Sequence, residues 1–151
     1  MNKLLIMTGA AATMFSAWAT ATLNGNILTF NVASGEETYS NILTSSIEGI
    51  VKTGAGTIIL TASSTGFTSG KPITISGGAI EIQNANALGS GNIVTVANGA
   101  TFRMVYSSGN GKSNDIVLQG GLLIGAFTCR LAQQSDGLTL LDLASPRLQL
   151  R

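Results

Sequence analysis

Side chains of the same class return at a step of about 22 residues along much of this 151-residue chain. The period is clearest in two apolar columns and one column of small residues: Ile58, Ile80, Phe102 and Ile124; Leu60, Ile82, Met104 and Ala126; Ala55, Gly77, Gly99 and Gly121. Around these positions apolar and polar residues alternate, which is typical of strands with one buried face. A fixed period of this length indicates stacked copies of one supersecondary unit.

A second strand of each unit keeps nearly the same period. Its apolar positions form the pairs Val94–Ile116 and Val96–Leu118, which keep the full step, and the pairs Ile73–Val94 and Ile75–Val96, whose step is shorter by one position. The earlier copy is therefore displaced by one residue. We expect a β-bulge to absorb this slip.

These units predict an all-β fold, a β-solenoid with about 22 residues per rung. Each rung is expected to hold three short strands around glycine corners, and each strand to pair in parallel with its copy one rung away. The competing architecture is a sandwich of β-hairpins, whose strands recur at intervals of roughly 8–12 residues. A sandwich does not require one residue class to return at a fixed step in several columns, so the sequence favours the solenoid.

Polar residues also recur at this step. Glu81 and Arg103 are one full step apart in an outward-facing column with Ile59 and Gly125, which predicts an exposed ion pair between neighbouring rungs. Asn92 and Asn114 have the same spacing in a loop that enters a strand. We expect their amides to stack and to hydrogen-bond along the axis of the solenoid.

The repeat weakens towards both ends of the chain. Leu138 and Leu140 continue the column of Ile116 and Leu118, but Leu143 and Pro146 break the other columns. The sequence therefore predicts four segments: a helical signal peptide at 1–21, an N-terminal β segment or cap at 22–48, β-helix repeats at 49–127, and a C-terminal cap or divergent tail at 128–151.

The N-terminal segment resembles a secretory leader. Lys3 is the only charged residue before Glu36, and an apolar run follows it. Two overlapping small-x-small sites then place cleavage after Ala19 or after Ala21, and the sequence leaves both open. The alternative is a membrane anchor, since residues 4–23 carry no charge, but several of them are Thr, Ser or Gly and no basic flank follows. We expect a secreted or cell-surface protein that leaves the membrane once the leader is removed.

Charge and composition exclude several functions. Without Lys3 the chain has seven basic and seven acidic residues, which favours neither nucleic acid nor an anionic membrane surface as a partner. The chain has no His, which excludes a Ser-His-Asp triad and His-ligated metals. The single Cys129 cannot form an internal disulfide, and we expect it to be a small buried side chain.

Acidic residues offer no catalytic cluster. Solenoid enzymes that act on polysaccharides use grouped acids on one outer face. The acids of this chain are Glu36, Glu37, Glu48, Glu81, Asp115, Asp136 and Asp142, and the step of the repeat aligns none of them. The step from Asp115 reaches Gly137, next to Asp136, which is their closest approach. We therefore expect solvated surface acids, no enzyme activity, and no catalytic, cofactor-binding or metal-binding residues.

The glycine loop Gly54-Ala55-Gly56 invites comparison with phosphate-binding loops. A Walker loop requires a Lys followed by Ser or Thr after its second glycine, and a dinucleotide fingerprint opens a helix. Here a β-branched strand follows at 57–60. The loop is therefore predicted to be a corner between two strands.

The same segment carries a family resemblance. Its motifs are Gly49, Lys52, Gly54 to Thr57, Leu60, Thr65 to Gly70, Ile73 to Ile75, Gly78, Ile82, Ala87 to Gly91, and Val94 to Met104. Across residues 49–104 they resemble the autotransporter-associated β-strand repeat. The resemblance implies a right-handed parallel β-helix in the exported passenger of a bacterial surface protein, and it brings no catalytic residues. The chain holds about one full repeat and no translocator barrel, as expected of a short or truncated member.

These inferences predict an exported structural or adhesive β-helix segment. Its outer face of Thr, Ser and Asn is available to surface glycans or to other β-helix segments, although the sequence names no partner. Two alternatives stay open: a fragment of a β-helix carbohydrate-active enzyme, and a non-functional remnant of a longer protein.

Overall fold

The computed structural model describes residues 20–106, 114–125, 130–134 and 139–141, and this part of the chain is all-β. Its strands are β1 Ala21–Asn24, β2 Ile27–Asn31, β3 Glu36–Tyr39, β4 Gly49–Thr53, β5 Thr57–Leu60, β6 Pro72–Ile75, β7 Ala79–Ile82, β8 Ile93–Ala97, β9 Thr101–Met104, β10 Asp115–Gln119, β11 Leu122–Gly125, β12 Arg130–Gln134 and β13 Thr139–Leu141. These residues contain no helix that is long and apolar enough to cross a membrane.

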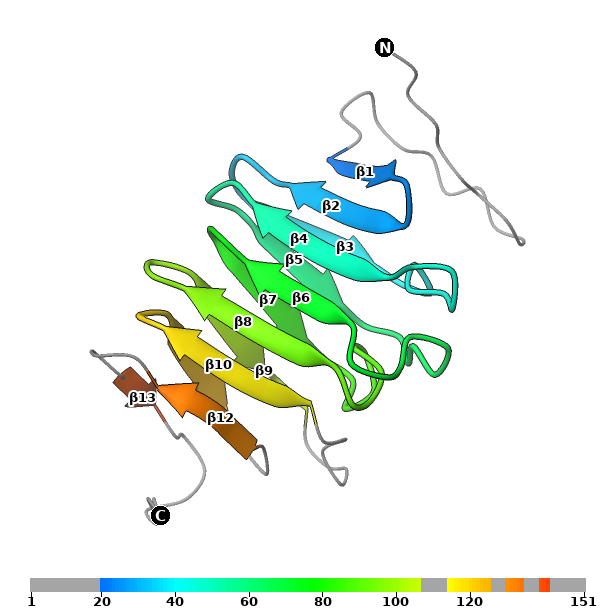
Figure 1. The fold of residues 1–151 in the computed structure, drawn as a ribbon. Helices are drawn as coiled ribbons and strands as arrows, with labels where there is room; N and C mark the ends of the chain where they lie inside the picture. Colours follow the sequence, from blue (N-terminus) through cyan, green and yellow to red (C-terminus); the bar gives the residue numbers. More distant parts are fainter. Residues whose placement is uncertain (1–19, 107–113, 126–129, 135–138, 142–151) are drawn as a thin grey trace.

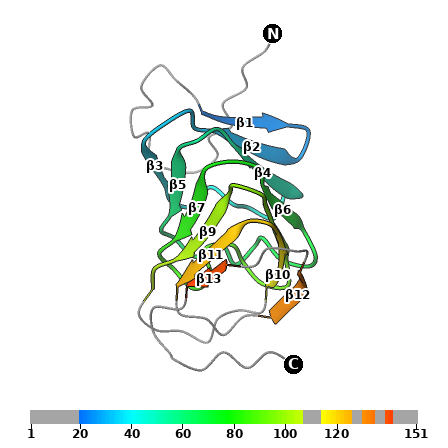
Figure 2. The ribbon, with the colours of Figure 1, turned by 90° about the vertical axis from the view of Figure 1, so that its left-hand side faces the viewer.

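The strands alternate between two sheets, as a coiled chain requires. Sheet A has the order β1-β2-β4-β6-β8-β10-β12, and sheet B has the order β13-β11-β9-β7-β5-β3. In Figure 1 the chain runs left along the front sheet, returns right along the rear sheet and descends with each rung. The coil is therefore right-handed, as parallel crossover connections almost always are. Figure 2 shows the two sheets as opposite walls of one solenoid.

The register confirms the predicted period. Ile58 pairs with Ile80 and Ile80 with Phe102, which gives about 22 residues per rung, a length within the usual range of stacked repeats. The equal step from Val94 to Ile116 is also confirmed, as is the step from Ile73 to Val94, which is shorter by one position. Parallel pairing of like positions excludes the hairpin sandwich for these strands.

The corners between the two sheets differ in length, and this difference shows that two expectations, the bulge and the inward position of Ile124, are wrong. Pairing between β6 and β8 has no register shift, so the predicted bulge is absent there. The slip lies in the corner, because Ala79 follows Ile75 by four positions whereas Thr101 follows Val96 by five.

The corner after β10 is short in the same way. Leu123, not Ile124, therefore pairs with Phe102; Gly125, not Ala126, pairs with Met104; and Ile124, not Gly125, pairs with Arg103.

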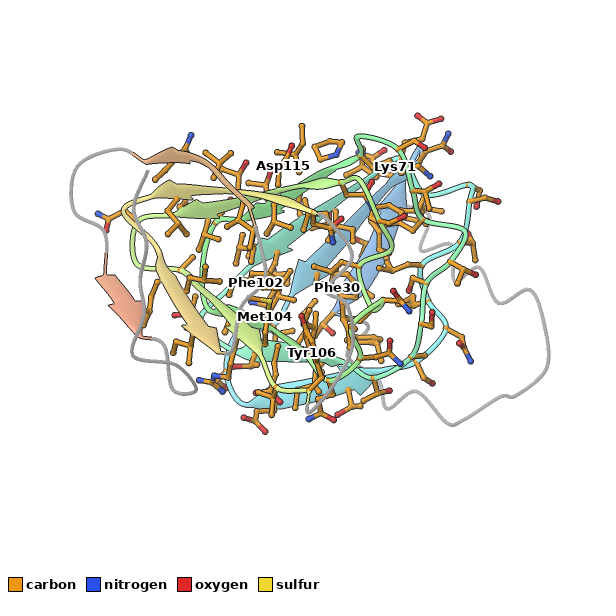
Figure 3. The ribbon with its side chains drawn as sticks, turned by 90° about the horizontal axis from the view of Figure 1, so that it is seen from below. Phe30, Lys71, Phe102, Met104, Tyr106 and Asp115 are labelled. Carbon is orange, nitrogen blue, oxygen red and sulfur yellow. The ribbon has the colours of Figure 1, made fainter. Side chains whose placement is uncertain are left out.

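Inward side chains from both sheets form one core. One inward column of sheet A contains Phe30, Lys52, Ile75, Val96 and Leu118, and one inward column of sheet B contains Glu37, Ile58, Ile80, Phe102 and Leu123. Figure 3 shows Phe30, Phe102 and Met104 pointing into the space between the sheets. The rings of Phe30 and Tyr39 meet edge to face, with their centroids 4.9 Å apart.

The third side of each rung differs from the prediction of a third strand. Among the described residues it carries one isolated parallel bridge, between Thr68 and Ser90. Loops form the rest of the described part of this side, and Phe67 and Leu88 point inward from them as buried core residues. The rungs whose third side is described therefore have two strands and one loop side.

Both ends of the solenoid extend beyond the clearest repeats. Residues 22–48 include β2 and β3, which form a rung in register with the next, and β1 lies antiparallel to β2 at the edge of sheet A. At the other end, β12 and β13 continue both sheets into the segment predicted to be a cap or divergent tail. Leu131 pairs with Ile116, and Leu140 pairs with Leu123 rather than extending the Leu118 column. Leu138, Leu143 and Pro146 lie outside the described residues.

The glycine loop is a corner, as predicted. Gly54 has φ +76°, and a Cβ there would lie 2.2 Å from the carbonyl oxygen of Val32 on the preceding rung. Gly56 donates its N–H to the same oxygen at 2.9 Å, and a Cβ on Gly56 would also collide with Val32. The glycines are therefore required by close stacking of successive corners.

Two adjacent residues test the core. Ile58 is fully buried and Ile59 is half-buried on the outside of β5. We expect Ile58→Ala to lower the free energy of unfolding by about 2–5 kcal/mol, because it leaves a cavity. Ile59→Ala, the matched control, should cost about 1 kcal/mol or less. Denaturant titration followed by circular dichroism measures both, and equal losses would contradict the inward assignment.

Candidate functional site

Along β2, β4, β6, β8 and β10, the outer face of sheet A is nearly free of charge. We use this name for the outward positions of β2, β4, β6, β8 and β10 and the residue after β6, which form three columns: Ile27, Gly49, Pro72, Ile93 and Asp115; Thr29, Val51, Thr74, Thr95 and Val117; Asn31, Thr53, Ser76, Ala97 and Gln119. Asp115 is the only charged residue in these columns. Rows of hydroxyl, amide and methyl groups recur here at the spacing of parallel strands, roughly 4.8 Å.

The first of these columns is largely apolar and exposed, and it forms a row along one margin of this face. Ile27 and Ile93 are 36% and 41% exposed, and Pro72 between them is also exposed. A Cβ on Gly49 would lie 2.9 Å from Cδ1 of Ile27 and 3.4 Å from Cγ of Pro72, so Ile27 leans across this glycine. The row makes the margin apolar, while the neighbouring columns supply hydrogen-bonding groups.

Lys52 is fully buried and points into the core. Its Nζ donates to the carbonyl oxygens of Thr53 at 2.6 Å, Gly54 at 3.0 Å and Gly77 at 3.2 Å. Burial lowers the pKa of Lys52, and the negative charge of Glu37 opposes that shift. The side chain joins the corners of two rungs. Lys52 alternates with the buried Ile50 along β4, and this alternation is the sequence signal for its inner position.

The two asparagines lie one rung apart, and a hydrogen bond links them along the axis, as predicted. Asn92 accepts from the Lys71 N–H at 3.0 Å and donates to the carbonyl oxygens of Phe67 at 2.9 Å and Leu88 at 2.8 Å. The N–H of Asn92 donates to Oδ1 of Asn114 at 3.0 Å. The amides therefore bond to backbone rather than to one another. Each one satisfies polar groups where a loop enters a strand.

The ion pair between Glu81 and Arg103 forms at 3.0 Å. The expectation that it is exposed is wrong for Glu81, which is 9% exposed, whereas the Arg103 side chain is 37% exposed. Gln83 donates to the second carboxylate oxygen of Glu81 at 2.9 Å. The pair fixes the register of β7 against β9 and satisfies a largely buried carboxylate.

A polar cluster lies at the N-terminal end of the core. Glu37 occupies the inner column beside Ile58. Its carboxylate accepts hydrogen bonds from the hydroxyls of Tyr39, at 2.5 Å, and of Thr20. The two hydroxyl oxygens are 2.8 Å apart. Burial, followed by the hydrogen bond to Glu37, raises the pKa of Tyr39 to about 12. The expectation that Glu37 is a solvated surface acid is therefore wrong. The repeat could not predict this cluster, because β1 and the residue before it lie outside the repeat.

The remaining acids lie apart from one another. Glu36 and Glu48 are exposed, and Asp115 lies outside sheet A, as Figure 3 shows. Asp136, Asp142 and Cys129 fall outside the described residues, as does the predicted proximity of Asp115 and Asp136. Within the part of the chain that the structure describes, no group of three His, Cys, Asp or Glu side chains could hold a metal ion.

No protein-family model, curated protein or solved structure matches this chain. The resemblance of residues 49–104 to the autotransporter-associated repeat therefore rests on the motifs alone. The chemistry of the outer face and of the polar clusters is the basis for inferring what the chain does.

Asn92 provides a test of the asparagine contacts. Asn92→Leu leaves three buried backbone groups without partners, so the free energy of unfolding should fall by about 2–4 kcal/mol. Asn114→Leu is the matched control. Asn114 is half-buried, with one contact at 3.0 Å and one at 3.5 Å, and its replacement should cost about 1 kcal/mol. Chemical unfolding of both variants decides this, and similar losses would contradict the proposed roles.

The raised pKa of Tyr39 predicts an alkaline loss of stability. The protonated phenol is favoured in the folded state, so its contribution is fully present below the ordinary pKa of about 10 and is lost as the pH rises to about 12. The difference in unfolding free energy between the natural chain and Tyr39→Phe should shrink by up to about 2 kcal/mol across this window. Lys52, with its lowered pKa, favours folding more as the pH rises, but it is common to both proteins. A constant difference from pH 9 to pH 12 would contradict this prediction.

Proposed function

We propose that this chain is an exported, non-catalytic β-solenoid segment that binds neutral glycans on the outer face of sheet A. The observation that carries the proposal is the chemistry of that face. Hydroxyl and amide columns lie beside an apolar row, and Asp115 alone is charged. Neutral sugars present the same combination of hydroxyl groups and apolar C–H faces.

Geometry supports a polymeric ligand. The outward columns run along the solenoid axis through five rungs, so equivalent groups return at a constant interval. A polysaccharide chain also repeats its groups at a constant interval, and each added sugar could make similar contacts. Many weak contacts of one kind suit adhesion, because binding strengthens with the number engaged.

Sequence features support export. Lys3, the apolar run and the small-x-small sites form a leader pattern, and residues 49–104 resemble a repeat of bacterial passenger proteins. The three outward columns hold no basic residue, and nucleic acid binding requires basic residues. A surface or secreted location brings the face to extracellular polysaccharide.

Two matched double variants test the binding face. Thr74 and Thr95 are half-buried on the outer face of sheet A, whereas Thr57 and Thr101 are half-buried outward residues of sheet B. We expect the natural chain to be retained by a neutral polysaccharide in affinity electrophoresis. Thr74→Lys with Thr95→Lys should weaken retention by about tenfold or more, since lost hydrogen bonds amount to about 1–2 kcal/mol. Thr57→Lys with Thr101→Lys should leave it unchanged.

Three outcomes would contradict the proposal. Absence of retention on a panel of neutral polysaccharides would refute glycan binding, and equal loss in the two double variants would refute the assigned face. Release of reducing sugar by the purified chain would refute the non-catalytic role.

A further inference from the structure

Glu37 occupies a position that is apolar on the following rungs. Its neighbours along the inner column of sheet B are Ile58, Ile80 and Phe102. The negative charge of Glu37 acts on the pKa of Lys52, but the ion pair found among the described residues joins Glu81 and Arg103. Two hydroxyls contact the Glu37 carboxylate. A carboxylate in an inner column is costly without a cation close to it.

Thr20 and Ala21 are integral parts of the end of the solenoid. The carbonyl oxygen of Thr20 accepts the Asn31 N–H at 2.7 Å, and its hydroxyl bonds to Glu37. Ala21 pairs with Phe30 in the antiparallel ladder and packs against the core. Cleavage of the leader after Ala21 would remove both residues from the mature protein. Cleavage after Ala19 would retain them.

We infer that the leader is removed by hydrolysis of the Ala19–Thr20 bond, and that the new α-amino group of Thr20 becomes the cationic partner of Glu37. This inference rests on the proposed export. Water adds across the peptide bond, Ala19 leaves with the new carboxylate, and Thr20 acquires an amine. That amine is protonated at neutral pH, since an α-amino group has an ordinary pKa of about 8.

Covalent geometry brings the new charge to the carboxylate. The Thr20 nitrogen is three bonds from its own hydroxyl oxygen, so the two atoms are roughly 3–4 Å apart. Because that hydroxyl donates a hydrogen bond to Glu37, the ammonium group arises within roughly 6–7 Å of the carboxylate. Opposite charges at this separation attract each other, and they do so more strongly near a protein surface than in bulk water. Processing would thus replace a neutral amide by a positive charge beside Glu37.

The first experiment locates the cleavage site. The full chain is expressed in a bacterial host, and the intact mass of the exported protein is measured. A mature chain that begins at Thr20 is expected, and one that begins at Thr22 would overturn the inference. Ala17→Gln alters only the first small-x-small site and should abolish or slow processing. Ala21→Gln alters only the second and should leave the cleavage after Ala19 unchanged.

The second experiment tests the new charge. Insertion of Gly-Ser between Ala19 and Thr20 of the full chain gives a processed protein in which Thr20 keeps a neutral amide. We expect its thermal midpoint at pH 7 to be about 2–5 °C lower than that of the normal mature chain. In a Glu37→Gln background the two midpoints should coincide. Equal midpoints in the natural background, or a difference that persists with Glu37→Gln, would overturn the pairing.

Failure of export is distinguishable from failure of this inference. A chain that stays unprocessed inside the cell refutes the proposed export and the processing with it. A chain that is exported but cut elsewhere refutes only the assignment of the Ala19–Thr20 bond.

Discussion

Parallel pairing between equivalent positions of successive rungs is the constraint on which the rest of this structure depends. Because each strand pairs with its copy, a side chain that faces inward on one rung has an inward neighbour above and below. Ile58, Ile80 and Phe102 illustrate this for sheet B. Polar residues that enter such a column must find partners locally, which explains the three carbonyl oxygens around Lys52. The corners must stack equally closely, hence the glycines at 54 and 56.

This constraint decides how much of the fold the sequence could predict. The period and the inner columns were visible because stacked positions share a residue class, and the same argument predicted the Glu81–Arg103 and Asn92–Asn114 contacts. The prediction was wrong at Ile124, because the corner before β11 is one residue shorter than the corner before β9. Three consecutive aliphatic residues follow this corner, and Leu123 is the one that points inward. Nothing in the residue types distinguishes those registers; the length of the corner does.

Burial and end effects were harder to predict than register. Glu81 was assigned to the surface by alternation, yet it is largely buried, because Arg103 and Gln83 bind it from two sides. The cluster of Thr20, Glu37 and Tyr39 depends on β1, which runs antiparallel to its neighbour and obeys no repeat. Periodic reasoning describes the interior of a solenoid; its ends follow from contacts that occur only once.

The end of the solenoid presents a problem that the interior rungs do not have. An inward residue of the first rung has a stacked neighbour on one side only, so residues outside the repeat must cover its other side. Glu37 places a carboxylate at such a position, and the hydroxyls of Thr20 and Tyr39 satisfy it. The antiparallel β1 pairs with β2 and becomes the edge strand of sheet A. An antiparallel end strand breaks the parallel pairing that the repeats use, so the regular outer face of sheet A begins at β2.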